Sequence, residues 1–161
     1  MRLTVFFCVF FAATLFTPAF SQNNAFLSFS VGTLGIDDHN KAVDYRLEYR
    51  ASKSIKGFSP TLGLQATSQA SLYSFMGFSR DVRMSNEFYL VPSLGVGAYR
   101  QGDGKNLGGV LEFRSGLEFA LNLGMNARAS VAVHHLSNSS IYQRNPGIES
   151  IVFSYCFVRP K

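Results

Sequence analysis

The sequence predicts an all-β protein, an eight-stranded antiparallel transmembrane β-barrel of the outer-membrane type. Eight stretches of about ten residues alternate apolar with polar or small side chains, which is the pattern of strands that turn one face to lipid. A secretory signal precedes all eight stretches. After that signal, no apolar run approaches the length of about 20 residues that a membrane-spanning helix requires.

The first 21 residues have the three parts of a cleaved secretory signal. Arg2 supplies a positive charge, residues 5–16 are almost wholly apolar, and Ala19-Phe20-Ser21 offers the small residues that a signal peptidase reads. The apolar run is too short to cross a bilayer as a helix. We therefore expect residues 1–21 to be removed and residues 22–161 to form a single β-barrel domain.

The second expected strand shows the alternation most clearly, because charged residues from Asp44 to Arg50 occupy every second position between apolar ones. In a barrel of eight strands this charged side faces a narrow lumen that side chains fill. In a secreted two-sheet sandwich, the alternative fold, it would face water. Pro92 leaves the register of the fifth strand open, because proline cannot donate a ladder hydrogen bond. The expected strands are residues 26–32, 43–51, 59–67, 71–82, 87–100, 111–119, 127–137 and 148–158.

Aromatic residues and connections indicate how the barrel lies in the membrane. With the N-terminus in the periplasm, the periplasmic turns fall at residues 52–56, 83–86 and 123–126, and the outer loops at 33–40, 68–70, 101–107 and 138–147. Aromatic residues near strand ends are expected to form the girdles at the two membrane interfaces. They are Tyr45, Tyr49, Phe75, Phe88, Tyr99 and Phe157.

Composition excludes several classes of function. Removal of Arg2 lowers the formal net charge from +5 to +4, and mixed signs along the chain argue against a nucleic-acid surface. Cys156 is the only cysteine after the signal, so there is no disulfide framework and no cysteine pair for a metal. Phosphate-loop, zinc and calcium motifs are absent from the sequence. We expect no cofactor and no metal.

Three polar side chains interrupt the apolar, outward face of the last two strands. Arg128 and Ser130 mark the inward side of the strand over 127–137, so His135 and Ser137 face lipid. Glu149 shares the parity of the bulky apolar residues of the last strand. Polar groups are costly on a lipid-facing wall and call for a function. All three lie at the outer end of the last hairpin.

Their chemistry is that of an acyl-transfer triad, with Ser137 as nucleophile, His135 as base and Glu149 as the group that orients the base. Residues i and i+2 of a strand lie about 6.6 Å apart, which tilted side chains can bridge. Asn138 could donate to an oxyanion. Lipid headgroups would explain one polar residue at a strand end, but not three of complementary chemistry. His134 points inward and is expected to be a hydrogen-bonded histidine of the lumen.

Around these residues the chain resembles the lipid A 3-O-deacylase (PagL) family of outer-membrane barrel hydrolases. The resemblance rests on His135-Leu136-Ser137-Asn138 and on Asn145-Pro146-Gly147-Ile148-Glu149-Ser150, with fourteen residues from His135 to Glu149. It implies a carboxylic ester hydrolase that removes the 3-position acyl chain of lipid A, the anchor of lipopolysaccharide, in the outer membrane of a Gram-negative bacterium. It assigns His135, Ser137 and Glu149 to the triad and Asn138 to the oxyanion site, with no metal or cofactor.

Two other functions fit the same residues. The first is an outer-membrane phospholipase that uses the same triad on a glycerophospholipid. The second is a non-catalytic small barrel that serves adhesion or envelope integrity. The sequence leaves the oligomeric state and the preferred acyl length open.

Overall fold

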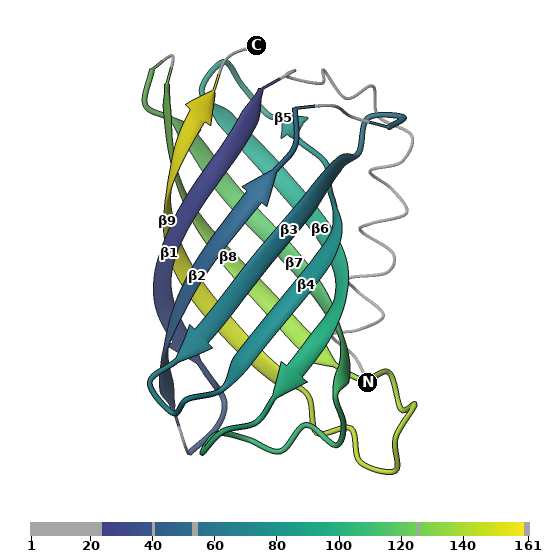
Figure 1. Ribbon diagram of the computed structural model, residues 1–161. Coiled ribbons are helices and arrows are strands. Elements are labelled where there is room, and N and C mark those ends of the chain that lie inside the picture. The colour runs from purple at the N-terminus through teal and green to yellow at the C-terminus, as the bar shows by residue number, and fades with distance from the viewer. Residues whose placement is uncertain (1–23, 40, 53–54, 125, 160–161) are drawn as a thin grey trace.

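The computed structural model describes residues 24–39, 41–52, 55–124 and 126–159, and the expected signal peptide, residues 1–21, lies outside them. Strands make up the regular structure of the described residues (Figure 1). No helix among these residues is long and apolar enough to cross a membrane. The strands are β1 (Ala25–Leu34), β2 (Ala42–Arg50), β3 (Ser59–Thr67), β4 (Leu72–Ser79), β5 (Val82–Arg83), β6 (Phe88–Arg100), β7 (Leu111–Asn122), β8 (Ala127–Ser137) and β9 (Ile148–Arg159).

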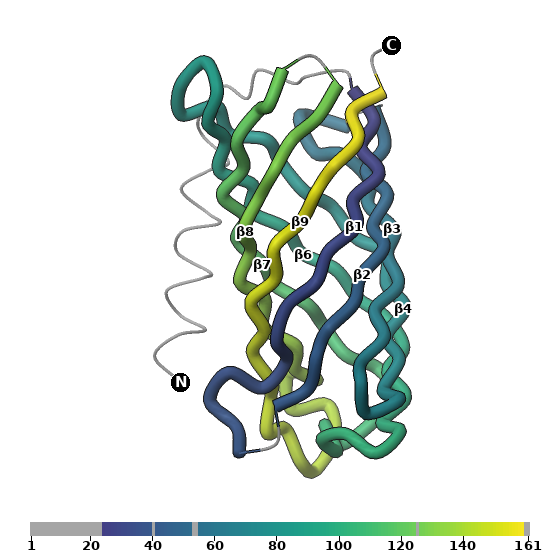
Figure 2. Tube along the Cα trace, turned by 90° about the vertical axis from the view of Figure 1, so that its left-hand side faces the viewer, coloured from purple at the N-terminus to yellow at the C-terminus, as the bar shows by residue number. Residues whose placement is uncertain are grey.

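The sheet closes into a barrel because the first and last strands pair with each other. Around the ring the order is β1, β2, β3, β4, β6, β7, β8 and β9, and every neighbouring pair is antiparallel. Figure 2 shows β9 and β1 side by side. Each of these eight long strands therefore has two hydrogen-bonded neighbours, as a bilayer requires. The predicted eight-stranded antiparallel barrel is confirmed.

The short strand β5 continues β4 beyond a break opposite Pro92. The pairs Ser79–Ser93 and Val82–Leu90 have the same register, so the break inserts no extra residue. Pro92 has no N–H to donate, although its carbonyl still accepts a backbone hydrogen bond of 3.1 Å. The strand expected over 71–82 is therefore divided in two, and Pro92 leaves the register intact.

The two ends of the barrel carry different connections (Figure 1). Residues 51–58, 84–87 and 123–126 connect strands at the end where β9 finishes, here called the turn end. Residues 35–41, 68–71, 101–110 and 138–147 connect them at the other end, the loop end. These positions agree with the expected periplasmic turns and outer loops.

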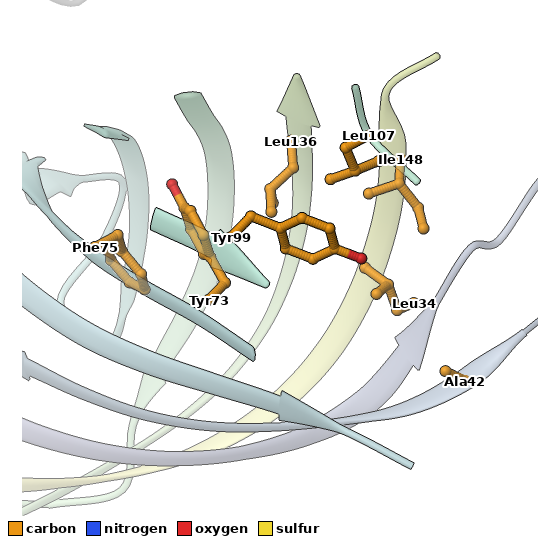
Figure 3. Close-up of a cluster of buried hydrophobic side chains, with 8 residues drawn as sticks. All are labelled: Leu34, Ala42, Tyr73, Phe75, Tyr99, Leu107, Leu136 and Ile148. Carbon is orange, nitrogen blue, oxygen red and sulfur yellow. The ribbon is translucent and has the colours of Figure 1, made fainter. Parts of the chain in front are cut away.

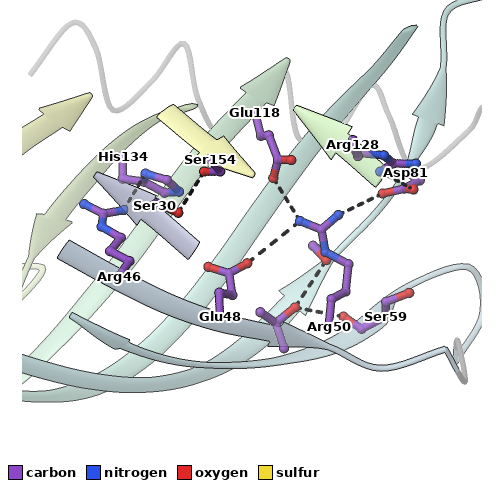
Figure 4. Close-up of polar contacts among 12 residues, drawn as sticks. Ser30, Arg46, Glu48, Arg50, Ser59, Asp81, Glu118, Arg128, His134 and Ser154 are labelled. Carbon is purple, nitrogen blue, oxygen red and sulfur yellow. Dashed lines mark hydrogen bonds and ion pairs between the residues drawn. The ribbon is translucent and has the colours of Figure 1, made fainter. Parts of the chain in front are cut away.

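Ion pairs between inward side chains fill much of the lumen (Figure 4). Arg50 of β2 lies 3.1 Å from Asp81 and 2.9 Å from Glu118. Glu48, two residues earlier on β2, lies 2.9 Å from Arg114 of β7. Each of these five side chains is at most 14% exposed. The charged side of the second strand thus faces a packed lumen and pairs there, as predicted.

A cluster of buried apolar side chains occupies the lumen toward the loop end (Figure 3). It includes the stacked pair of Tyr73 and Phe75, whose ring centroids lie 5.5 Å apart. A Cβ atom on Gly63 would stand 2.2 Å from the Phe75 ring, so the ring requires a bare backbone at that position. The members of the cluster are Leu34, Ala42, Tyr73, Phe75, Tyr99, Leu107, Leu136 and Ile148.

Fewer aromatic residues face the lipid than the sequence suggested. Tyr45, Tyr49 and Phe157 point outward and are about half exposed. Phe75 and Tyr99 are buried in the lumen, so their assignment to the girdles is wrong. Both lie on the inward parity of their strands, and parity decides which way a strand side chain points. An aromatic residue near a strand end is therefore no evidence of lipid contact by itself.

Candidate active site

The outward faces of β8 and β9 carry His135, Ser137 and Glu149. Burial alternates along β8, with Arg128, His134 and the other inward residues buried and their neighbours more exposed. The β8–β9 register sets His135 opposite Glu149, and a slip of one residue would have turned Glu149 into the lumen. The three side chains therefore share the lipid-facing wall at the loop end, as the sequence predicted.

His135 and Glu149 are in direct contact. The Nδ1 atom of His135 lies 2.8 Å from Oε1 of Glu149, and both side chains remain about one-quarter exposed. An ionised carboxylate only accepts hydrogen bonds, so Nδ1 carries the proton and donates it. In the neutral imidazole the lone pair is then on Nε2, which is free to accept a proton. This contact thereby selects the tautomer of a general base.

The unprotonated edge of the imidazole lies against Gly147. Gly147 comes directly before Ile148, which forms the last β8–β9 ladder pair with Leu136. A Cβ atom on Gly147 would lie 2.8 Å from Cε1 and 3.5 Å from Nε2 of His135. The ring therefore leans toward the loop end, where Ser137 lies. No hydrogen bond within the described part of the chain uses the Ser137 hydroxyl.

Asn138 is fully buried and all of its N–H groups are engaged. Its Nδ2 atom donates to the carbonyls of Leu107 and Arg144, each at 2.7 Å. Its backbone N–H donates to the side-chain oxygen of Asn145 at 3.0 Å, and its own side-chain oxygen accepts from the backbone of Ser140, also at 3.0 Å. Asn138 thus holds the loop over 138–147 together from within, and it also connects this loop to the neighbouring loop over 101–110.

The same two loops meet at a second point. The Tyr142 ring occupies the space of the missing Gly109 side chain, where a Cβ atom would lie 1.9 Å from the ring. The Tyr142 hydroxyl accepts a 3.2 Å hydrogen bond from the backbone N–H of Leu111. The chain that follows Ser137 is therefore held against the loop that precedes β7.

His134 points away from the site, into the lumen (Figure 4). Its Nδ1 atom lies 2.7 Å from Arg46 and its Nε2 atom lies 2.6 Å from Arg114. Burial and these two neighbours confirm the prediction that it is a hydrogen-bonded lumenal histidine.

A further polar residue, Ser115, lies beside the site and was missed in the sequence. The β7–β8 register sets Ser115 opposite His135, on the outward face of β7. The sequence did contain a hint of this residue, because Ser115 interrupts the outward apolar series of Phe113 and Leu117. A single serine in a strand is a weak deviation until the register shows what lies opposite it.

Metal binding has no candidate in this region. Within the part of the chain that the structure describes, no three His, Cys, Asp or Glu side chains are grouped so that they could hold a metal ion.

A comparison of the whole sequence with models of known protein families finds a match. The family model described as "Lipid A 3-O-deacylase (PagL)" matches residues 28–157, which is most of the chain and includes all eight long strands in whole or in part. The chain belongs to the lipid A 3-O-deacylase (PagL) family. The resemblance found in the sequence is thereby confirmed, although comparison with functionally curated proteins gives no match.

Solved structures agree on the fold of this PagL family member. The crystal structure of the outer membrane enzyme PagL superposes with a TM-score of 0.62 at 22% identity, covering 81% of this chain and 97% of that one. A de novo designed transmembrane β-barrel gives 0.66 at 10% identity, with 88% and 100% covered. Neisserial surface protein A gives 0.54 at 10% identity, with 83% and 95% covered. At these identities the likeness shows the fold alone.

Family membership identifies the class and the compartment. PagL proteins are lipid A deacylases, so the chain is a hydrolase of the Gram-negative outer membrane that works on lipid A.

Proposed function

We propose that this PagL family member hydrolyses the ester of the 3-position acyl chain of lipid A with Ser137 as nucleophile, His135 as base and Glu149 as orienting carboxylate. The observation that carries the proposal is the 2.8 Å contact between His135 Nδ1 and Glu149 Oε1 on the lipid-facing wall beside Ser137. Two groups that a lipid environment disfavours are brought together there and leave Nε2 able to accept a proton.

The reaction then follows the steps of acyl transfer. Ser137 Oγ attacks the ester carbonyl while His135 Nε2 accepts the hydroxyl proton. The tetrahedral intermediate collapses, the bond to the sugar oxygen breaks, and the imidazolium returns its proton to that oxygen. Water, deprotonated by the same nitrogen, hydrolyses the acyl-Ser137 ester. The products are a free fatty acid and lipid A with a hydroxyl at its 3-position.

Glu149 supports both halves of this cycle. By accepting the Nδ1 proton it fixes the imidazole orientation, and its charge stabilises the imidazolium that forms each time Nε2 is protonated. The low polarity of the surroundings strengthens this interaction compared with the same pair in water.

For Asn138 we infer a contribution at the oxyanion site through the loop that it holds. Its side-chain N–H groups are occupied by two carbonyls and its backbone N–H by Asn145, so direct donation to an oxyanion requires that it exchange one of these partners. By tying residues 138–147 to the neighbouring loop, it holds in place the backbone next to Ser137.

The position of the site fits a substrate that stays in the membrane. Lipid A lies in the outer leaflet, and its acyl esters lie at the depth where acyl chains meet the headgroup. With the loop end outside the cell, the outward face near Ser137 meets that layer. Lipid A can then reach the site by lateral diffusion along the barrel wall.

The experiment is expression in a Gram-negative host followed by mass spectrometry of lipid A. The wild-type protein is expected to remove one hydroxyacyl chain from lipid A, and Ser137→Ala is expected to leave lipid A intact. An unchanged lipid A mass with the wild-type barrel present in the outer membrane would contradict the proposal. Release of fatty acid from phospholipid would favour the phospholipase, and no release at all would favour the non-catalytic barrel.

Glu149→Ala is expected to cost less activity than Ser137→Ala or His135→Ala. Losing the orienting carboxylate leaves nucleophile and base in place, and in serine hydrolases that loss is roughly 10- to 100-fold smaller. Initial rates of the three purified variants on one lipid A preparation measure the order. Equal residual rates in all three would contradict the assigned roles.

A further inference from the structure

Ser115 is a hydroxyl on the lipid-facing wall, in the same cross-strand row as His135 and Glu149. The register pairs Ser115 with His135 and His135 with Glu149, so the three side chains run side by side across β7, β8 and β9. The imidazole turns its Nδ1 atom toward β9, which leaves the β7 side of the row to Ser115.

The Ser115 hydroxyl has no hydrogen-bond partner within the described part of the chain. Its outward neighbours on β7 are Phe113 on one side and Leu117 on the other. Ser115 is smaller than either neighbour, and its hydroxyl faces lipid with its hydrogen-bonding capacity unused. What distinguishes it from an ordinary outward serine is its place directly beside His135.

The distance from Ser137 to Ser115 corresponds to a particular atom of the acyl chain. Ser137 pairs with Phe113, and Ser115 lies two residues further along β7 toward the turn end. Two residues span about 6.6 Å along a strand, and neighbouring strands lie about 4.8 Å apart. The Cα atoms of Ser115 and Ser137 are therefore about 8 Å apart.

A hydroxyl on the third carbon of the acyl chain has the reach to meet Ser115. When the carbonyl carbon is bonded to Ser137 Oγ, the third carbon lies two bonds further along the chain, about 2.5 Å, and the C–O bonds at the two ends add about 1.4 Å each. A hydrogen bond from its oxygen to a serine hydroxyl adds about 2.8 Å. In an extended chain that runs toward the turn end, these lengths sum to about 8 Å, the separation of the two serines.

We propose that Ser115 binds the 3-hydroxyl of the departing acyl chain and makes the enzyme selective for 3-hydroxyacyl esters. This inference rests on the proposed function, because it takes Ser137 as the point where the ester carbonyl is attacked. Ser115 is a specificity residue in this scheme and takes no part in proton transfer. An unhydroxylated chain would cover the Ser115 hydroxyl and leave it unpaired, which is how a site built to hydrogen-bond a substrate hydroxyl rejects the analogue that lacks it.

The test compares two synthetic substrates that differ by one oxygen atom. They are the 3-hydroxydecanoyl and decanoyl esters of the same N-acylglucosamine, presented in mixed micelles to the purified full-length barrel. The wild type is expected to prefer the hydroxylated ester in kcat/KM. Ser115→Ala is expected to lower kcat/KM for that ester about tenfold, the effect of one hydrogen bond, and to leave the decanoyl ester unchanged. Ser115→Thr, which retains the hydroxyl, should retain the preference.

Ser74→Ala is the matched control, since Ser74 is also an outward serine but lies on β4, away from the site. It should change neither rate. Equal hydrolysis of the two esters by the wild type would overturn the inference, and so would an equal loss on both esters in Ser115→Ala. These results leave the proposed function standing, whereas full activity of Ser137→Ala would remove the proposed function itself.

Discussion

Gly147 lies against the edge of the His135 ring that the proposed mechanism uses. Its backbone adopts a φ of 61°, which suits glycine, and its missing side chain leaves room for His135 Cε1. The opposite edge of the ring is held by Glu149. The imidazole is thus confined between a carboxylate and bare backbone, which fixes the position of the ring.

Gly147→Ala is expected to lower kcat about 10²-fold, because the new methyl group moves the imidazole by a fraction of an ångström to an ångström. The matched control is Gly124→Ala in the turn over 123–126. Gly124 also has a positive φ, 116°, but nothing lies within 4 Å of its Cβ position. The two variants share the backbone strain, and only Gly147→Ala disturbs His135. Similar losses of kcat in purified, folded samples of both would argue against a positioning role for Gly147.

The sequence was enough to predict those residues of the candidate site that the alternation of inward and outward side chains identifies. His135, Ser137 and Glu149 were found because a period of two is enough to separate the outward from the inward side of a strand. Ser115 required the register between β7 and β8, and Gly147 required the direction of the imidazole. Both depend on neighbours that are distant in sequence or on a side-chain torsion, and residue order alone specifies neither.

At the level of elements, Asn138 connects the loop of the β8–β9 hairpin to the loop that precedes β7. Two carbonyls, one from residues 101–110 and one from residues 138–147, accept from the same amide group. Gly108 makes this possible, since a Cβ atom there would lie 2.1 Å from the Arg144 carbonyl oxygen. The loops therefore form one unit at the loop end of the barrel.

Asn138→Ala is expected to release the loop over 138–147 and to lower kcat/KM for lipid A at least tenfold. The substitution removes three side-chain hydrogen bonds and leaves the buried Leu107 carbonyl unpaired, at a cost of about 1–3 kcal/mol. Limited proteolysis of the folded protein in micelles should show new cleavage after Arg144. Ser140→Ala, whose backbone N–H bond to Asn138 survives, serves as the control. A cleavage pattern like that of the wild type would contradict the role of Asn138 in holding this loop.

The strands themselves could largely be predicted, and the departures have local causes. The expected bounds lie within a few residues of β1, β2, β3, β6, β7, β8 and β9. The break between β4 and β5 comes from the missing N–H of Pro92, whose effect on the partner strand needs the pairing to be known. Phe75 and Tyr99 were assigned outward because they are aromatic, although parity turns them inward.

At the scale of the whole molecule, the lumen holds the barrel together with charge as well as apolar contact. Arg128 is fully buried, pairs with Asp81 at 2.9 Å and lies over the rings of Phe26 and Tyr89. Arg50 shares Asp81 and adds Glu118. These side chains come from strands on different sides of the ring, so each pair braces the barrel across its axis.

Arg50→Ala is expected to lower the free energy of unfolding by about 3–5 kcal/mol, because it leaves the buried Glu118 carboxylate without its arginine and removes one of the two arginines that pair with Asp81. Urea unfolding in lipid vesicles, followed by the gel mobility of the folded barrel, measures the change. Arg83→Ala, at an exposed arginine of the turn end, should change it by less than about 0.5 kcal/mol. The folded fraction of Arg50→Ala should keep its rate on lipid A, since the site lies on the outer wall. Equal stability of the two variants would contradict a bracing role for Arg50.

The seam between β1 and β9 reaches the candidate site at its loop end. Glu149 lies near the start of the strand that closes the ring, and its backbone carbonyl accepts a 2.7 Å hydrogen bond from Gly35, just beyond β1. Until this seam closes, β9 is paired with β8 alone, so on the proposed mechanism the backbone that carries Glu149 is held from one side only. Closure in the outer membrane would complete the site beside its lipid. On the proposed mechanism the orienting carboxylate therefore gains its second backbone support only when the ring is closed.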